Sequence, residues 1–93
     1  MRGPRDDPPD LVDLHGLSPE EAERRLAQAL HAARVRGLRE LRVVTGRGWG
    51  NLRQEPLLRR RIEQFLAGPA GARYGVRSVR VAAKGGALDL VLG

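Results

Sequence analysis

The sequence predicts an α/β domain, a two-layer βαβαββ sandwich of a four-stranded mixed sheet and two helices. Short apolar runs typical of strands alternate with two longer segments in which apolar residues recur at helical spacing. The last two strand-like runs are separated only by a short turn, which makes the sheet mixed. Two helices cannot cover both faces of such a sheet, so we expect one open or partly polar face.

The length and composition indicate one small domain. Its 93 residues suffice for a modest core and are too few for a second catalytic domain. Residues 1–10 are polar and proline-rich and are expected to be a disordered lead-in to a folded domain at 11–93. The absence of cysteine excludes disulfides and thiolate metal sites. Neither a membrane span nor a signal peptide is present, so we expect a cytoplasmic protein without membrane partners.

The first strand and the helix after it have clear sequence boundaries. Residues 11–14 form the strand, which we expect to be central in the sheet. Ser18 fits a helix N-cap, Pro19 fits the first helical position, and Glu21 completes a capping box. Gly37 is the natural C-terminal stop. The apolar face of this helix contains Ala22, Leu26, Ala29, Leu30 and Ala33.

The rest of the chain supplies a second helix and three more strands. The second strand covers residues 39–45, and because a helix separates it from the first strand, the two should be parallel. Pro56 cannot lie deep inside a helix, so we expect the second helix to begin there and to end at residues 68–71. The last two strands are expected at residues 76–81 and 88–92.

The charge balance favours a polyanionic partner. The chain has 17 basic and 11 acidic residues, a net charge of +6, and every basic residue except Lys84 is arginine. Arginine matches phosphate oxygens in pairs and stacks on bases. Codon bias in a GC-rich genome would also explain the arginine excess. Three aromatic residues are too few for a base-stacking platform.

Asp13 and His15 are candidate catalytic residues at the end of the first strand. They are two residues apart, so their side chains share a face if the strand persists that far. A carboxylate beside an imidazole fixes the ring, which suits a proton carrier near neutral pH. The alternative is that Asp13 merely caps a turn, with His15 packed beside it.

A glycine-rich loop follows the second strand. Gly46 and Gly48 offer backbone N–H groups to a phosphate, Arg47 can add charge, and Thr45 can donate a hydrogen bond. Gly50 is a further candidate for phosphate binding in this loop. The alternative is a tight connection that holds no ligand. The spacing Gly46-x-Gly48-x-Gly50 is not the dinucleotide fingerprint, and no Walker lysine follows, which argues against a nucleotide cofactor.

Trp49 within this loop, and Arg53 and Arg59 after it, are candidates for nucleic-acid contacts. Trp49 either stacks on a base or covers the edge of the core. Arg53 and Arg59 either follow phosphates or lie on a solvated helix face.

The motifs Asp13-Leu14-His15-Gly16 and Thr45-Gly46-Arg47-Gly48 resemble those of the Smr (small MutS-related) domain family. The helix pattern Leu58-Arg59 with Ile62 and Leu66 fits as well, and the resemblance covers residues 11–92. It implies a compact α/β sandwich in which the two motifs lie side by side. It also implies a nucleic-acid-binding domain that in several relatives is an endonuclease, nicking DNA or cutting RNA.

Three departures from the family pattern bear on activity. One is the loop from Trp49 to Leu57, which is longer than usual before the second helix and could reshape substrate access. Many relatives carry histidine where this chain has Thr45, which removes a second imidazole from the expected site. The late family turn Gly-Gly-x-Gly-Ala stands here as Ala83-Lys84-Gly85-Gly86-Ala87.

We therefore expect a metal-independent ribonuclease. His15 would move the proton of an attacking 2′-hydroxyl, and Arg47 and the loop amides would stabilise the phosphorane. DNA nicking would instead need a metal-activated water at Asp13, and one aspartate with one histidine is a poor divalent site, so no cofactor is expected. The alternatives are a non-catalytic nucleic-acid-binding module and a protein-interaction domain. We expect a monomer.

Overall fold

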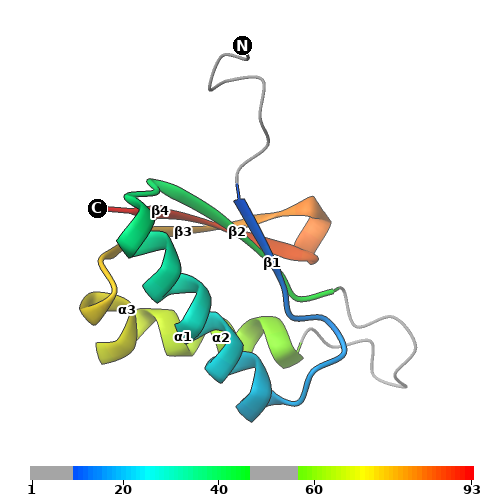
Figure 1. Ribbon diagram of the computed structural model, residues 1–93. Helices are drawn as coiled ribbons and strands as arrows, with labels where there is room; N and C mark the ends of the chain where they lie inside the picture. Colours follow the sequence, from blue (N-terminus) through cyan, green and yellow to red (C-terminus); the bar gives the residue numbers. More distant parts are fainter. Residues whose placement is uncertain (1–9, 47–56) are drawn as a thin grey trace.

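The computed structural model describes residues 10–46 and 57–93. In these ranges the chain forms a four-stranded sheet with its helices on one side (Figure 1). The elements, in chain order, are β1 (Asp10–Asp13), α1 (Pro19–Arg36), β2 (Glu40–Val44), α2 (Leu57–Ala67), α3 (Pro69–Arg73), β3 (Val76–Ala82), the 3-10 turn η2 (Ala83–Gly85) and β4 (Ala87–Leu92). The predicted α/β class is confirmed.

The sheet has the strand order β1-β2-β4-β3. β1 pairs with β2 in parallel, as the intervening helix predicts, and β4 pairs antiparallel with both β2 and β3. The expectation that the first strand is central is wrong. β4 adds to β2 on the side away from β1, so β1 lies at an edge of the sheet.

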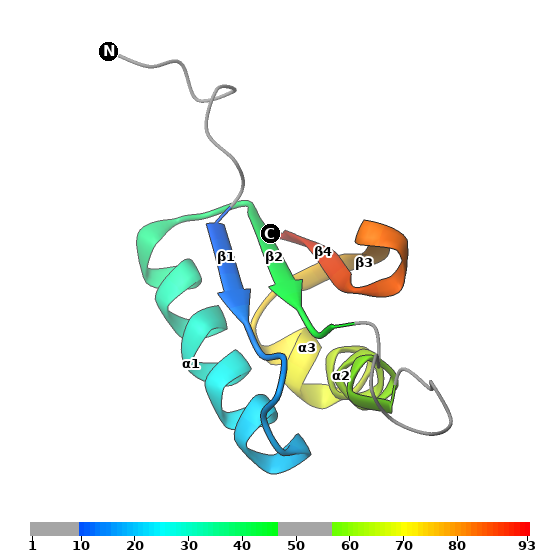
Figure 2. The ribbon, with the colours of Figure 1, turned by 90° about the vertical axis from the view of Figure 1, so that its right-hand side faces the viewer.

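The core lies between the sheet and the helices, which all cover the same face (Figure 2). Leu26 and Leu30 of α1 and Ile62 of α2 are fully buried against the sheet. On the other face, Arg42 and Asp89 occupy paired positions of β2 and β4. The expected open and partly polar face is therefore confirmed.

The predicted capping of α1 is also confirmed. The Ser18 hydroxyl accepts a hydrogen bond from the Glu21 N–H at 3.2 Å, and Pro19 is the first helical residue. Gly37 ends the helix in the left-handed conformation, with φ 72°, and its N–H donates to the carbonyls of Ala33 and Arg34. These local signals fix where α1 starts and stops.

The structure has a third helix where the sequence predicts two. Gly68 ends α2 and then caps α3, which begins at Pro69. Gly71 of α3 comes so close to the Leu66 carbonyl of α2 that a side chain would not fit there. Pro56, the expected start of the second helix, lies outside the described residues, and α2 begins at Leu57 within them.

Candidate functional site

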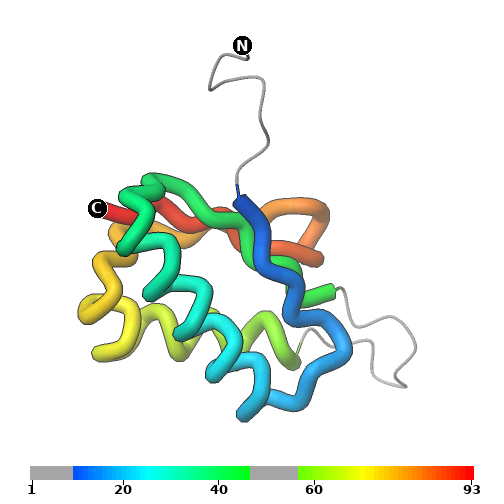
Figure 3. The backbone as a smooth tube through the Cα atoms, viewed as in Figure 1, coloured from blue at the N-terminus to red at the C-terminus, as the bar shows by residue number. Residues whose placement is uncertain are grey.

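The ends of β1 and β2 bring Asp13 and His15 of the first motif close to Thr45 and Gly46, the residues of the second motif that the structure describes. In Figure 3 the two strands run side by side in the same direction, so both end on the same side of the sheet. Asp13 pairs with Val44, and the Leu14 N–H then donates to the Val44 carbonyl at 2.7 Å, so the chains stay adjacent beyond β1. This pairing places His15 beside the residues that follow β2.

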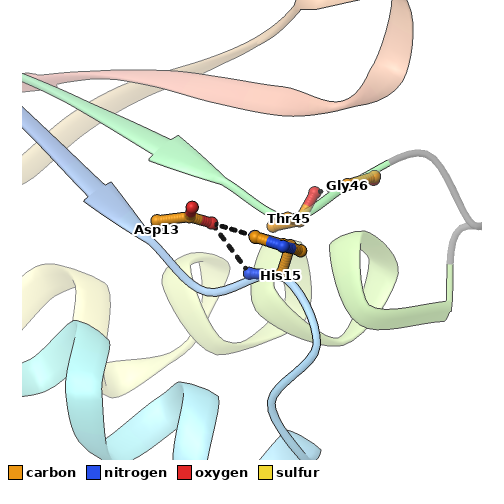
Figure 4. Close-up of polar contacts among 4 residues, drawn as sticks. All are labelled: Asp13, His15, Thr45 and Gly46. Carbon is orange, nitrogen blue, oxygen red and sulfur yellow. Dashed lines mark hydrogen bonds and ion pairs between the residues drawn. The ribbon is translucent and has the colours of Figure 1, made fainter.

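Asp13 holds His15 by two hydrogen bonds (Figure 4). One Asp13 carboxylate oxygen, Oδ1, accepts from the His15 backbone N–H at 3.1 Å and from the ring atom Nδ1 at 2.7 Å. The hydrogen bond from the imidazole is the main cause that lowers the pKa of the Asp13 carboxyl below its ordinary value, and the backbone N–H adds to it. Asp13 therefore stays ionised and orients the ring.

This arrangement selects one form of the His15 ring. An ionised carboxylate can only accept, so Nδ1 carries the proton of the shared hydrogen bond. In the neutral ring the other nitrogen, Nε2, is then a free base. The His15 side chain is 67% exposed, so the imidazole is accessible to a ligand from solvent. The interpretation of this pair as a proton carrier thus has suitable geometry.

Gly46 lies directly against His15. It has φ 81°, and a Cβ added to it would lie 3.4 Å from the His15 Cβ. Its N–H, however, donates to the Gly86 carbonyl at 3.0 Å, and the Thr45 N–H donates to the same oxygen at 2.9 Å. The expectation that the Gly46 N–H faces a phosphate does not match this pairing. Gly46 instead supplies the left-handed backbone that follows β2 in contact with His15.

Thr45 is buried beneath this contact, with 5% exposure. Its hydroxyl donates to the Gly46 carbonyl at 3.3 Å. The predicted role of Thr45 as a hydrogen-bond donor to a ligand would require this hydroxyl to turn outward. As placed, Thr45 supports the backbone of the loop and contributes no ionisable group.

The turn between β3 and β4 holds the residues that follow β2, a contact that the sequence did not predict. Gly86, at the end of this turn, provides the carbonyl that holds Thr45 and Gly46. Lys84 within the turn has φ 55° and ψ 36°, a left-handed conformation that costs energy for a residue with a side chain. The departure from glycine in this motif was visible in the sequence, but its contact with the Thr45 loop was not.

Arg59 also contacts this turn. Its guanidinium atom Nη1 donates to the Gly85 carbonyl at 3.3 Å, and the side chain is half-buried. The predicted phosphate contact of Arg59 stays a prediction, since this structure shows the residue joining α2 to the turn. The other predicted site residues, Arg47, Gly48, Trp49, Gly50 and Arg53, lie outside the described residues.

The described residues contain neither a metal-binding cluster nor a membrane-spanning helix. No cluster of three or more His, Asp or Glu side chains in residues 10–46 and 57–93 could hold a metal ion. Within the same part of the chain, no helix is long and apolar enough to cross a membrane.

Sequence comparison relates the chain to a known endonuclease. Residues 12–88 match the family model of the Smr domain. The chain is 47% identical over 64 residues to "Endonuclease MutS2" of Thermus thermophilus, an alignment that covers 64% of this chain and 9% of that protein. The chain therefore matches only a small part of this curated relative.

Structural comparison gives the same family. The crystal structure of the Smr domain of Thermus thermophilus MutS2 matches with a TM-score of 0.71 and 32% identity, covering 90% of this chain and 98% of that one. The solution structure of the Smr domain of NEDD4-binding protein 2 has the same fold, with a TM-score of 0.63, 24% identity and coverage of 94% and 88%. Because residues 12–88, most of its length, match the family model, the chain belongs to the Smr domain family.

Proposed function

We propose that this Smr domain binds nucleic acid and cleaves RNA at His15. The observation that carries the proposal is the Asp13–His15 pair, in which the carboxylate holds Nδ1 and the exposed ring keeps Nε2 as a base. The similarity to the endonuclease MutS2 supports the same class of reaction. The net charge of +6 favours a polyanionic substrate.

The proposed step is attack of a ribose 2′-hydroxyl on the adjacent phosphorus. Nε2 of His15 takes the proton from O2′, a new O2′–P bond forms, and the P–O5′ bond breaks. The 5′-oxygen takes a proton from water and the imidazolium releases its extra proton to solvent, so the products are a 2′,3′-cyclic phosphate and a 5′-hydroxyl and the base is restored. Asp13 stabilises the imidazolium formed in between and keeps its ring oriented. Arg47 and the N–H of Gly48 are our candidates to stabilise the phosphorane.

A labelled RNA incubated with the protein in EDTA tests this proposal. His15→Ala should lower the cleavage rate by about 10²- to 10⁴-fold, because general acid–base catalysis contributes a factor of this size. His31→Ala is the matched control, since His31 is the other histidine and lies exposed on α1, away from Asp13. Undiminished cleavage by the His15→Ala protein would overturn the role of His15. A DNA of the same sequence should remain intact, because it lacks the 2′-hydroxyl.

A second candidate function is binding without cleavage, and the burial of Thr45 favours it. Its hydroxyl is held by the Gly46 carbonyl, so this position offers no second group to protonate the leaving oxygen. A protein of this kind would bind RNA and leave it intact both in EDTA and in Mg²⁺. The assay above therefore separates the two functions.

A further inference from the structure

A broad hollow at the far end of the sheet gathers three arginines. It lies where β2 begins and β4 ends, opposite the end that holds His15, and has a volume of about 680 Å³. Arg34, Arg39 and Arg77 line it, together with Tyr74. We call this feature the arginine hollow.

Contacts of the Arg34 and Arg77 side chains and of the Arg39 backbone place these residues around the hollow. The Arg34 guanidinium donates to the Arg73 carbonyl at 2.6 Å, which ties the end of α1 to α3. The Arg39 carbonyl accepts from the Leu92 N–H at 2.8 Å, so Arg39 extends the pairing of β2 with β4. The Arg77 side chain lies over Gly93, where a Cβ would overlap it. The hollow is thus shaped by the sheet end and the helix ends.

The charges of the arginine hollow are not neutralised within the described part of the chain. Elsewhere in this part, Arg36, Arg42 and Arg61 each form an ion pair with a carboxylate. In residues 10–46 and 57–93, none of the three arginines of the hollow has such a pair. One acidic residue, Glu40, also lines the hollow. The excess of positive charge fits an anionic ligand.

The open face of the sheet connects this hollow to the His15 end. Glu40 and Val91 line both the arginine hollow and a smaller depression of about 160 Å³, to which Ser78, Arg80 and Asp89 also contribute. β2 then leads from Arg39 toward Gly46, beside His15. At a rise of about 3.3 Å per residue this path is roughly 23 Å long. Along one strand of B-form DNA the phosphates rise about 3.4 Å each, so the path corresponds to about seven nucleotides of that helix, and to slightly more in the shorter rise of an A-form RNA helix.

We infer that the arginine hollow is a second phosphate-binding site of this domain. A nucleic-acid strand then lies along the open sheet face, with one phosphate at His15 and another, about seven nucleotides away, at Arg34, Arg39 and Arg77. This inference rests on the proposed function for the identity of the ligand. It predicts a minimum length of nucleic acid that can reach both sites. It also adds a contact that contributes to binding and takes no part in cleavage.

The salt dependence of RNA binding tests the inference. The double variant Arg39→Gln/Arg77→Gln should lower the slope of log K against log salt by about 1.4 to 1.8, because each lost phosphate contact removes about 0.7 to 0.9. The corresponding double lysine variant keeps the charges and should retain most of the slope. Arg24→Gln is the matched control, because Arg24 is an exposed arginine on α1 that does not line the hollow. Equal melting temperatures show that the variants are folded.

RNA length provides a second measurement. A hairpin with a stem of four base pairs spans about 14 Å and cannot reach both sites, whereas a stem of twelve base pairs can. The wild-type protein should bind the longer stem more tightly than the shorter one. In the double glutamine variant, the ratio of these two affinities should be at least fivefold smaller. Arg24→Gln should keep the wild-type ratio.

The outcomes separate this inference from the proposed function. If the wild-type protein binds RNA with a steep salt slope that the double glutamine variant does not change, the second site is overturned and the proposed function stands. The second phosphate-binding site is also overturned if the protein binds polyglutamate and not RNA, and if this binding is lost in the double glutamine variant. That result would indicate an acidic protein partner at the hollow. If RNA binding depends on the hollow but RNA is never cleaved, the nuclease proposal fails and the second site stands. If RNA does not bind at all, both fail.

Discussion

His15 and Gly46 lie against each other although they belong to separate motifs, and a methyl group at Gly46 would lie 3.4 Å from the His15 Cβ. The contact is maintained by two hydrogen bonds to the Gly86 carbonyl on one side and by the Asp13 carboxylate on the other. The position of the imidazole thus depends on the backbone after β2.

Gly46→Ala should damage the site more than its effect on stability explains. Its φ of 81° makes a side chain cost about 1 to 2 kcal/mol of unfolding free energy, and any backbone shift that relieves this strain moves the segment in direct contact with His15. Gly37→Ala is the matched control, because Gly37 has φ 72° with nothing within 4 Å of the added Cβ. We expect similar losses in denaturant unfolding for both variants. RNA cleavage or binding should weaken at least tenfold in Gly46→Ala alone, and equal activity of the two proteins would contradict the importance of this contact.

The sequence predicted the parts of the fold that local signals control. Ser18, Pro19 and Gly37 define α1 through hydrogen bonds within a few residues, and a helix between two strands predicts that they are parallel. The edge position of β1 was missed because it depends on which side of β2 receives β4, a long-range choice. The helix α3 was missed because Gly68 and Pro69 resemble a stop, while Gly71 gives this short helix close contact with α2.

In the candidate site, too, local features could be predicted from the sequence and long-range contacts could not. Asp13 and His15 are two residues apart, so their interaction was foreseeable from the sequence. The pairing of the Gly46 N–H with Gly86 joins distant segments, and the glycine pattern alone could not distinguish it from a free N–H aimed at an anion. The arginine hollow was invisible for the same reason, since Arg34, Arg39 and Arg77 come from three separate elements.

The ion pair of Arg42 with Asp89 should make part of the stability pH-dependent. The guanidinium bonds both carboxylate oxygens, at 2.7 and 2.9 Å, and this hydrogen bonding lowers the pKa of Asp89 below its ordinary value. A carboxylate with a lowered folded pKa stabilises the fold above the unfolded pKa of about 3.9. That contribution disappears as the pH falls through the lower, folded value.

A double-mutant cycle with Arg42→Gln and Asp89→Asn measures this contribution. Both side chains are more than a third exposed, so we expect a coupling of only about 0.5 to 1 kcal/mol at pH 7. The coupling should be smaller at pH 2, which lies below the unfolded pKa of about 3.9, because the contribution of the ionised Asp89 is lost as the pH falls from the unfolded toward the lower, folded pKa. Denaturant unfolding of the four proteins at both pH values provides the test, and a coupling that is undiminished in acid would contradict an electrostatic origin.

Lys84→Gly should stabilise the protein. Lys84 has φ 55° and ψ 36°, which costs a residue with a side chain about 1 to 2 kcal/mol, whereas glycine adopts this conformation freely. Glycine also loses about 0.5 to 1 kcal/mol of backbone entropy on folding, so the net gain should be about 0.5 to 1 kcal/mol. A thermal melt should show a rise of several degrees for a domain of this size. Lys84→Ala keeps the strain and should show no such rise, so an equal gain there would refute this explanation.

Gly71→Ala should be among the most destabilising small changes in the chain. Gly71 is buried in α3, and a Cβ there would overlap the Leu66 carbonyl of α2, which is backbone and cannot rotate away. The two helices would have to separate, so we expect a loss of about 3 kcal/mol or more in urea unfolding. Gly68→Ala is the matched control three residues earlier, because its nearest neighbour, the Gln64 carbonyl, would lie at an ordinary 3.5 Å. That variant should lose no more than about 1 kcal/mol, and similar losses in both proteins would show that helix propensity, rather than the close approach of α2 and α3, decides the cost.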